Sequence, residues 1–114
     1  MPSFEVWDLV KVPFPYTDRP VRQRRPALVI AAGELEAARG LLWLVMVTSA
    51  ANRGWPGDVL VSDLAIARLP IPSIIRPAKI ATVEARDAEP LGKLPPRDQR
   101  AVRRYLRQLL SDLD

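Results

Sequence analysis

Two arginines stand directly before a short apolar run in the segment 24–30, RRPALVI. Proline lacks an N–H and pushes the preceding residue, Arg25, toward an extended conformation, so we expect strand pairing to begin after Pro26. The run 27–30 is apolar throughout, as in a strand that is covered on both faces. A strand that carries guanidinium groups at its loop end can bind an anion. A basic segment is more often a solvated surface, and both interpretations stay open on residue chemistry alone.

Composition narrows the class of partner and of chemistry. The chain has 114 residues, 48% of them hydrophobic, which is enough for the core of one domain over residues 1–114. Its net charge of +4 favours an anionic partner, either nucleic acid or an acidic protein. Histidine and cysteine are absent, which removes the usual general base, the commonest metal ligands and thiolate chemistry. No acidic cluster has a recognisable metal-binding spacing, so we expect neither a metal nor a cofactor.

Targeting segments are not expected. The longest apolar run, 41–47, is too short to span a bilayer. Glu5, Asp8 and Lys11 interrupt the amino terminus, which therefore does not have the pattern of a secretion signal. We expect a cytoplasmic protein without a membrane partner.

Hydrophobic periodicity predicts a mainly β fold with a carboxy-terminal helix. Strands are expected over 4–14, 26–32, 41–48 and 58–61, and over 73–76 and 79–83 with a break or bend at Pro77. The strand 41–48 is expected to be central, with Trp43 in the core. Short helical turns fit 33–40 and 62–69. About six short strands with proline-rich corners are typical of a small barrel.

The last helix is expected over 97–113. One stripe at helical spacing is apolar and is expected to pack inward: Val102, Tyr105, Leu106, Leu109, Leu110 and Leu113. The opposite face carries Arg97, Arg100, Arg103, Arg104 and Arg107. Such a face is solvated more often than it binds nucleic acid.

Four motifs occur in an order and at a spacing that resemble a known family. They are VPFPYTD at 12–18, RRPALV at 24–29, VTS at 47–49, and LPIPSIIR followed by KIATV at 69–83. The order resembles the PemK/MazF toxins of type II toxin–antitoxin systems. The resemblance implies an SH3-like barrel of the PemK/MazF/CcdB kind and a homodimer. It also implies a metal-independent, sequence-specific endoribonuclease that cuts single-stranded RNA, and a cognate antitoxin as protein partner.

The resemblance assigns catalysis to Arg25 and Thr48. RNA carries its own nucleophile, the 2′-hydroxyl, so the enzyme must align the strand and stabilise charge on the phosphorane. The fork of Arg25 suits the second task, and Thr48 can hydrogen-bond the phosphate or the 2′-oxygen. The proton acceptor is not identified, although Asp18 is one candidate. Further RNA contacts are expected from Arg22, Arg24, Ser49, Asn52, Arg53, Arg76 and Lys79.

The sequence departs from the family pattern at several positions. Trp7 and Arg68 stand where the family usually has glycine, and Ala78 stands where some members have aspartate. The additional histidine of some members is missing. Trp55, beside Asn52 in the loop 50–57, could stack on a base, cover the barrel or contact a second copy.

Two other functions stay open. Gyrase-poisoning toxins share the fold, but they use an aromatic carboxy-terminal tail, and residues 110–114 read LSDLD. A catalytically silent RNA-binding or regulatory module is compatible with the departures at Trp7, Arg68 and Ala78.

Overall fold

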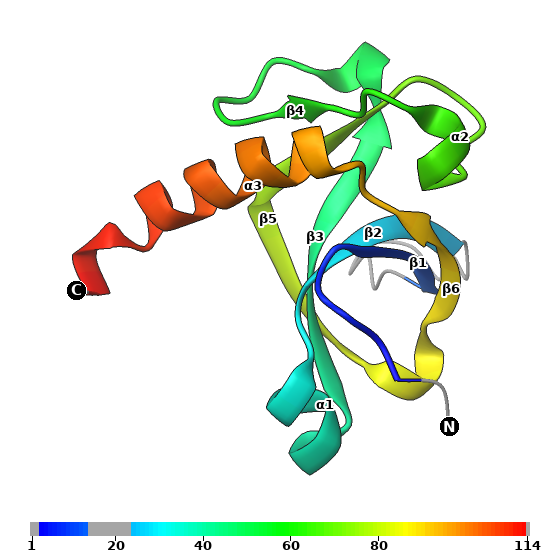
Figure 1. Ribbon diagram of the computed structural model, residues 1–114, viewed down its shortest axis with the longest axis vertical. Helices are drawn as coiled ribbons and strands as arrows, with labels where there is room; N and C mark the ends of the chain where they lie inside the picture. The colour runs from blue at the N-terminus through cyan, green and yellow to red at the C-terminus, as the bar shows by residue number, and fades with distance from the viewer. Residues whose placement is uncertain (1–2, 14–23, 114) are drawn as a thin grey trace, which may run out of the picture.

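The computed structural model describes residues 3–13 and 24–113, and its strands form one sheet with three helices (Figure 1). The strands are β1 (Asp8–Pro13), β2 (Arg24–Ala31), β3 (Leu41–Ser49), β4 (Val59–Leu60), β5 (Ser73–Glu84) and β6 (Glu89–Lys93). The helices are α1 (Gly33–Arg39), α2 (Leu64–Ala67) and α3 (Pro96–Leu109). Short 3₁₀ turns cover Ala50–Asn52, Ala85–Asp87 and Ser111–Leu113. None of these helices has the length and apolar composition of a membrane span.

The strand pairing confirms a mainly β fold with a carboxy-terminal helix. All strand pairs are antiparallel, and the order across the sheet is β4-β5-β3-β2-β1-β6. The sheet curls strongly, and α3 extends away from it (Figure 1). β3 is an inner strand, as its apolar sequence predicts, and the helical turns at 33–40 and 62–69 are confirmed as α1 and α2.

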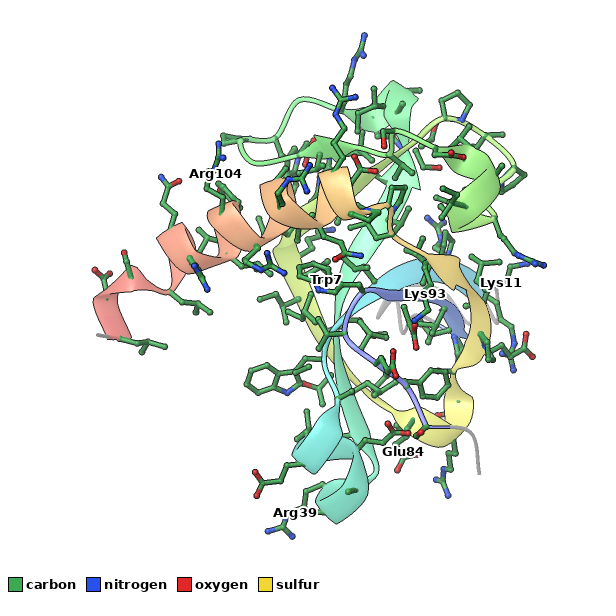
Figure 2. All side chains as sticks on the ribbon, in the orientation of Figure 1. Trp7, Lys11, Arg39, Glu84, Lys93 and Arg104 are labelled. Atoms are coloured by element: carbon green, nitrogen blue, oxygen red, sulfur yellow. The ribbon has the colours of Figure 1, made fainter. Side chains whose placement is uncertain are left out.

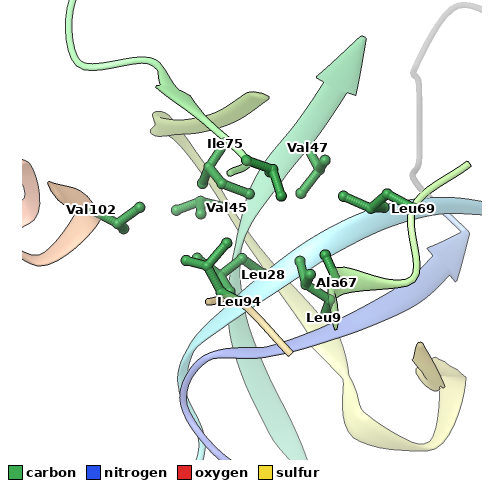
Figure 3. Close-up of a cluster of buried hydrophobic side chains, with 10 residues drawn as sticks. Leu9, Leu28, Val45, Val47, Ala67, Leu69, Ile75, Leu94 and Val102 are labelled. Atoms are coloured by element: carbon green, nitrogen blue, oxygen red, sulfur yellow. The ribbon is translucent and has the colours of Figure 1, made fainter. Parts of the chain in front are cut away.

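Two buried clusters lie on opposite faces of the sheet. Alternate residues of a strand point to opposite faces, and β2 accordingly divides its side chains between the clusters. Ala27 and Val29 join one cluster with Leu42 and Leu44. Leu28 joins the other, which α3 covers through Val102 and which Figure 3 shows. The prediction that β2 is covered on both faces is therefore confirmed.

The bounds of the first two strands differ from the prediction. β1 begins at Asp8 rather than at residue 4, because a turn precedes it in which the Asp8 amide donates to the Glu5 carbonyl oxygen (3.1 Å) and Trp7 has a φ of 82°. The predicted end at residue 14 lies outside the described residues. Pairing of β2 begins before Pro26, at Arg24, which is opposite Pro13. Proline is tolerated there because β2 is paired only with β1 until Ala27.

The strands predicted at 73–76 and 79–83 form one bent strand, β5. Met46 is opposite Arg76, whereas the preceding residue Val45 is opposite Ile80, so residues 77–79 form a bulge. A proline inside a strand favours such a bulge. β6 was not predicted, because Glu89–Lys93 contains a proline and a glycine and has only one large apolar residue.

The apolar stripe of the last helix is only partly buried. α3 ends at Leu109, and a 3₁₀ turn follows, so the predicted end at residue 113 is wrong. Val102 is fully buried, but Leu109, Leu110 and Leu113 are 45%, 51% and 80% exposed. Trp43 is also exposed (47%), which contradicts its predicted place in the core. Trp43 and Val45 lie on the same face of β3. α3 covers Val45, whereas Trp43 lies outside the buried cluster that contains Val45 and Val102.

Gly92 of β6 allows the sheet to pack closely against α2. A Cβ at this position would overlap the backbone carbonyl group of Ala67. Because backbone cannot move aside as a flexible side chain does, we expect Gly92→Ala to lower the free energy of unfolding by about 1–3 kcal/mol. Urea unfolding followed by circular dichroism measures the change. An unchanged midpoint would contradict this close packing.

Candidate functional site

A cleft of 460 Å³ opens where β1, β2 and β3 meet the segment after α2. It brings together five of the residues that the sequence predicts for the site: Arg24, Arg25, Thr48, Ser49 and Asn52. The other described lining residues are Lys11, Pro26, Val47, Arg68, Leu69, Pro70, Ile71, Ser73 and Leu91. Figure 2 shows Lys11 on the side of the molecule away from the free end of α3.

Neighbouring strands bring Arg25 and Thr48 to the same cleft. The ladder between β2 and β3 ends with Ala27 opposite Met46, and Arg25 and Thr48 each lie two residues beyond that pair. Residues two apart in a strand share a face, so both residues continue the face of that last pair. Both side chains line the cleft, and both residues are half-buried. Two residues that are far apart in sequence are thereby held on neighbouring rigid strands.

The Thr48 hydroxyl has a defined partner. Its Oγ1 accepts a hydrogen bond from the side-chain amide of Asn52 (3.0 Å). A hydroxyl that accepts from an amide keeps its own proton for donation, so Thr48 can donate toward a phosphate or 2′-oxygen in the cleft. Ser49 caps the following 3₁₀ turn, because its Oγ accepts from the Ala51 amide (3.2 Å).

The cleft is cationic. Its charged lining residues in the described chain are Lys11, Arg24, Arg25 and Arg68, and none of the described lining residues is acidic. Arg24 also forms an exposed ion pair with Glu89 of β6 (3.0 Å). Such a surface attracts a polyanion.

The remaining predicted contacts lie elsewhere. Arg53 and Lys79 are exposed but do not line the cleft, and Lys79 Nζ lies 5.5 Å from the centroid of the Trp55 ring. Arg22 and the candidate proton acceptor Asp18 lie outside the described residues.

Arg76, which the sequence predicts as an RNA contact, bonds within the protein and does not line the cleft. Its side chain is only 10% exposed, and it pairs with Asp58 (3.0 Å), whose side chain is 9% exposed. The pair lies at the base of the loop that follows Asn52. Burial raises the pKa of the Asp58 carboxyl, but hydrogen bonds from Arg76 and from the Trp55 and Gly54 amides outweigh burial and hold this pKa below its ordinary 3.8. Arg76 is thus engaged within the protein.

Lys11 and Arg68 are lining residues that the sequence did not predict for the site. Lys11 belongs to β1 and gave no signal beyond its alternation with apolar neighbours. Arg68 was noticeable in the sequence because the family usually has glycine at this position. It ends α2 with a φ of 58°, and Trp7, the other departure from glycine, has a φ of 82°. They are the two non-glycine residues with positive φ in the described chain, and glycine adopts such backbone most easily.

Arg68→Gly should therefore have opposite effects on stability and on binding. Relief of the left-handed conformation should raise the free energy of unfolding by up to about 1 kcal/mol. Loss of one cation from the cleft should weaken binding of a single-stranded oligonucleotide and reduce the slope of log K against log salt by about 0.7. Thermal unfolding and a salt titration of binding measure the two effects. Equal salt slopes for parent and variant would exclude Arg68 from the interface.

Metal binding has no ready site in the part of the chain that the structure describes. No group of three or more histidine, cysteine, aspartate or glutamate residues is placed there to hold an ion. The described cleft offers guanidinium groups, the Lys11 ammonium group, hydroxyls and one side-chain amide.

The sequence, the curled antiparallel sheet and the carboxy-terminal helix are those of a known protein family. Residues 5–110 match the family of PemK-like and MazF-like toxins of type II toxin–antitoxin systems. The chain belongs to this family. A comparison of its sequence with curated proteins found no match.

Solved structures agree with this assignment. MazF from Deinococcus radiodurans is 26% identical, with a TM-score of 0.76 over 97% of this chain and 99% of that chain. A MazE–MazF structure from the same organism is also 26% identical, with a TM-score of 0.75 over 96% and 97% of the two chains. An endoribonuclease in complex with its cognate antitoxin, from a mycobacterial species, is 15% identical and shares the fold, with a TM-score of 0.71 over 97% and 96%. The predicted PemK/MazF fold is confirmed.

Proposed function

We propose that this toxin is a metal-independent endoribonuclease that cuts single-stranded RNA at a short sequence and so inhibits translation in the cytoplasm. One observation carries the proposal. Arg25 and Thr48 line one cationic cleft from neighbouring strands, and the Asn52 amide leaves the Thr48 proton available for donation. The mycobacterial protein that shares the fold is named an endoribonuclease, and this name points the same way.

The proposed reaction starts from the RNA itself. The 2′-hydroxyl loses its proton as its oxygen attacks the adjacent phosphorus. The bond to the 5′-oxygen then breaks and that oxygen takes up a proton, so a 2′,3′-cyclic phosphate and a 5′-hydroxyl result. Negative charge gathers on the non-bridging oxygens of the phosphorane, where the fork of Arg25 is suited to bind it. A guanidinium group is a poor proton acceptor, so the role of Arg25 is electrostatic. Thr48 donates a hydrogen bond that orients the phosphate.

Cleavage of a long single-stranded RNA in excess EDTA tests the proposal. The parent chain should cut at one short recurring sequence and leave 2′,3′-cyclic phosphate and 5′-hydroxyl ends. Cutting should disappear in Arg25→Ala. Cleavage that persists in Arg25→Ala would keep the activity and contradict the site. Failure of folded protein to cut several unrelated RNAs would contradict the proposal and favour a silent binding module or a gyrase poison.

The toxin is also proposed to act as a homodimer, because an apolar face is left open beside α3. A groove of 630 Å³ runs along the end of this helix, lined by Trp7, Ile30 and the leucines of the helix end, with Arg103 and Arg107. Trp7 lies beneath the helix in Figure 2. Trp43 and Ile80 (49% exposed) lie on the same face of the sheet as α3, outside the part of this face that α3 covers. Apolar surface of this extent on a small chain marks an interface, and a second copy offers the same leucines to it.

Light scattering after size exclusion tests the dimer. The parent should have twice the chain mass of 12.7 kDa, and Leu110→Glu should move the mass toward one chain. Ile66→Glu is a matched control, because Ile66 and Leu110 are both 51% exposed and Ile66 lies on α2. A parent that elutes as a single chain at high concentration, or a dimer that survives Leu110→Glu, would contradict this interface.

The proposed protein partner is a cognate antitoxin with an acidic, disordered segment. The cationic cleft and the exposed arginines of α3 complement such a segment, which becomes ordered on binding. Occupation of the cleft would exclude RNA. Added antitoxin should therefore stop cleavage in proportion to the toxin that it binds.

A further inference from the structure

A buried carboxylate holds the loop between β3 and β4. Asp58 accepts hydrogen bonds at Oδ2 from the amides of Gly54 (3.2 Å) and Trp55 (3.1 Å). Arg76 of β5 approaches the same carboxylate with both arms of its fork, Nε to Oδ1 (3.1 Å) and Nη2 to Oδ2 (3.0 Å). A bidentate pair of this kind fixes direction as well as distance.

Arg76 extends the same contact to Asn52. Its Nη2 also donates to the backbone carbonyl oxygen of Asn52 (2.8 Å), and its guanidinium lies 4.3 Å from the centroid of the Trp55 ring. Arg76 is therefore held by Asp58 on one side and holds the loop backbone on the other.

Asn52 connects this network to the site. Its backbone carbonyl is the acceptor for Arg76, while its side-chain amide is the donor to Thr48 Oγ1 (3.0 Å). Asn52 is exposed, so close packing does not hold its side chain in place. Its amide keeps one direction because the backbone that carries it is fixed. An unbroken series of hydrogen bonds thus leads from Asp58 through Arg76 and Asn52 to Thr48.

We infer that Arg76 and Asp58 are positioning residues, which set the direction of the Thr48 hydroxyl by holding Asn52. Neither residue lines the cleft, and the side chains of both are about nine-tenths buried. The inference rests on the proposed function. It gives a role to the buried Arg76–Asp58 ion pair at the base of this exposed loop.

A double-mutant cycle in the full-length toxin tests this inference. Arg76→Lys keeps the charge opposite Asp58, but one ammonium group cannot serve the carboxylate and the Asn52 carbonyl in the same fork geometry. We expect a fall in kcat of about 10- to 100-fold with KM changed by less than about twofold. Asn52→Ala should cause a similar fall. In the Asn52→Ala background, Arg76→Lys should have little further effect, because both changes remove the same link.

Two results would overturn the inference. One is an Arg76→Lys effect on kcat of equal size with and without Asn52, which indicates a structural role. The other is unchanged kcat. Arg86→Lys is the matched control, because Arg86 forms an exposed ion pair with Glu84 (2.7 Å) away from the cleft. Asp58→Asn provides a second variant if Arg76→Lys does not fold.

A measurement that does not depend on cleavage separates this inference from the proposed function. In ¹⁵N–¹H spectra of the full-length chain, the side-chain amide signals of Asn52 should shift and broaden in Arg76→Lys and stay unchanged in Arg86→Lys. If the parent cuts no RNA, a shift still supports the positioning of Asn52 while the nuclease proposal fails. An unchanged Asn52 signal in Arg76→Lys overturns the inference whatever the activity.

Discussion

Replacing Arg25 with glutamine should slow cleavage of single-stranded RNA by about 10²- to 10³-fold. Glutamine keeps some of the length and hydrogen bonding of the side chain but removes the charge and the fork that bind the phosphorane. The loss should fall on kcat, because charge on the non-bridging oxygens is greatest in the transition state. Single-turnover kinetics on a short fluorescent RNA measure it.

Arg24→Gln is the matched control for this prediction. Arg24 lines the same cleft and precedes Arg25, but it is exposed and paired with Glu89. Its loss should mainly raise KM, by less than about tenfold, as for a phosphate contact that gives no transition-state selectivity. Equal losses in kcat for the two variants would show that general charge, rather than the position of Arg25, supports cleavage.

Removal of the Asp58 carboxylate should cause the largest loss of stability. Asp58→Ala leaves the Arg76 guanidinium buried without its ion pair and two loop amides without their acceptor. We expect the free energy of unfolding to fall by about 2–4 kcal/mol at neutral pH. Urea unfolding of parent and variant measures the difference.

The pH dependence of that difference follows from the lowered pKa of Asp58. Since this pKa in the folded chain is below its ordinary 3.8, the carboxylate contributes stability fully at pH values above about 4–5. The contribution disappears as the pH falls through the folded value. The difference in unfolding free energy between the parent and Asp58→Ala should therefore shrink below about pH 4. A constant difference down to about pH 2 would contradict the charged role of Asp58.

The sequence predicted the strands that carry Arg25 and Thr48 better than the surroundings of the cleft. Arg25 and Thr48 flank two continuous apolar runs, which predict strands, and the neighbouring strands then bring both residues to one cleft. Arg76 could not be recognised as buried, because its partner Asp58 is 18 positions away and only the fold brings them together. Local sequence patterns do not reveal which residues pair when they are far apart in the sequence.

The exposure of Trp43 and Leu110 could not be predicted from the sequence, for a different reason. Trp43 and Leu110 have the periodicity of core residues, yet both are exposed because α3 covers only part of the sheet face. Periodicity shows which face is apolar but not whether the same chain covers it. At Trp7 and Arg68, in contrast, the family usually has glycine, which indicates unusual backbone. Both residues have positive φ.

The central claim is that the 2′-hydroxyl of RNA is the nucleophile in the cleft of Arg25 and Thr48. Two short RNAs test it most directly. Both contain the mapped cleavage sequence, and one has a single 2′-deoxynucleotide on the 5′ side of the cut bond. In excess EDTA, we predict that the toxin binds both, cuts only the all-ribose strand and leaves a 2′,3′-cyclic phosphate. Cleavage of the 2′-deoxy strand at the same bond would contradict this claim.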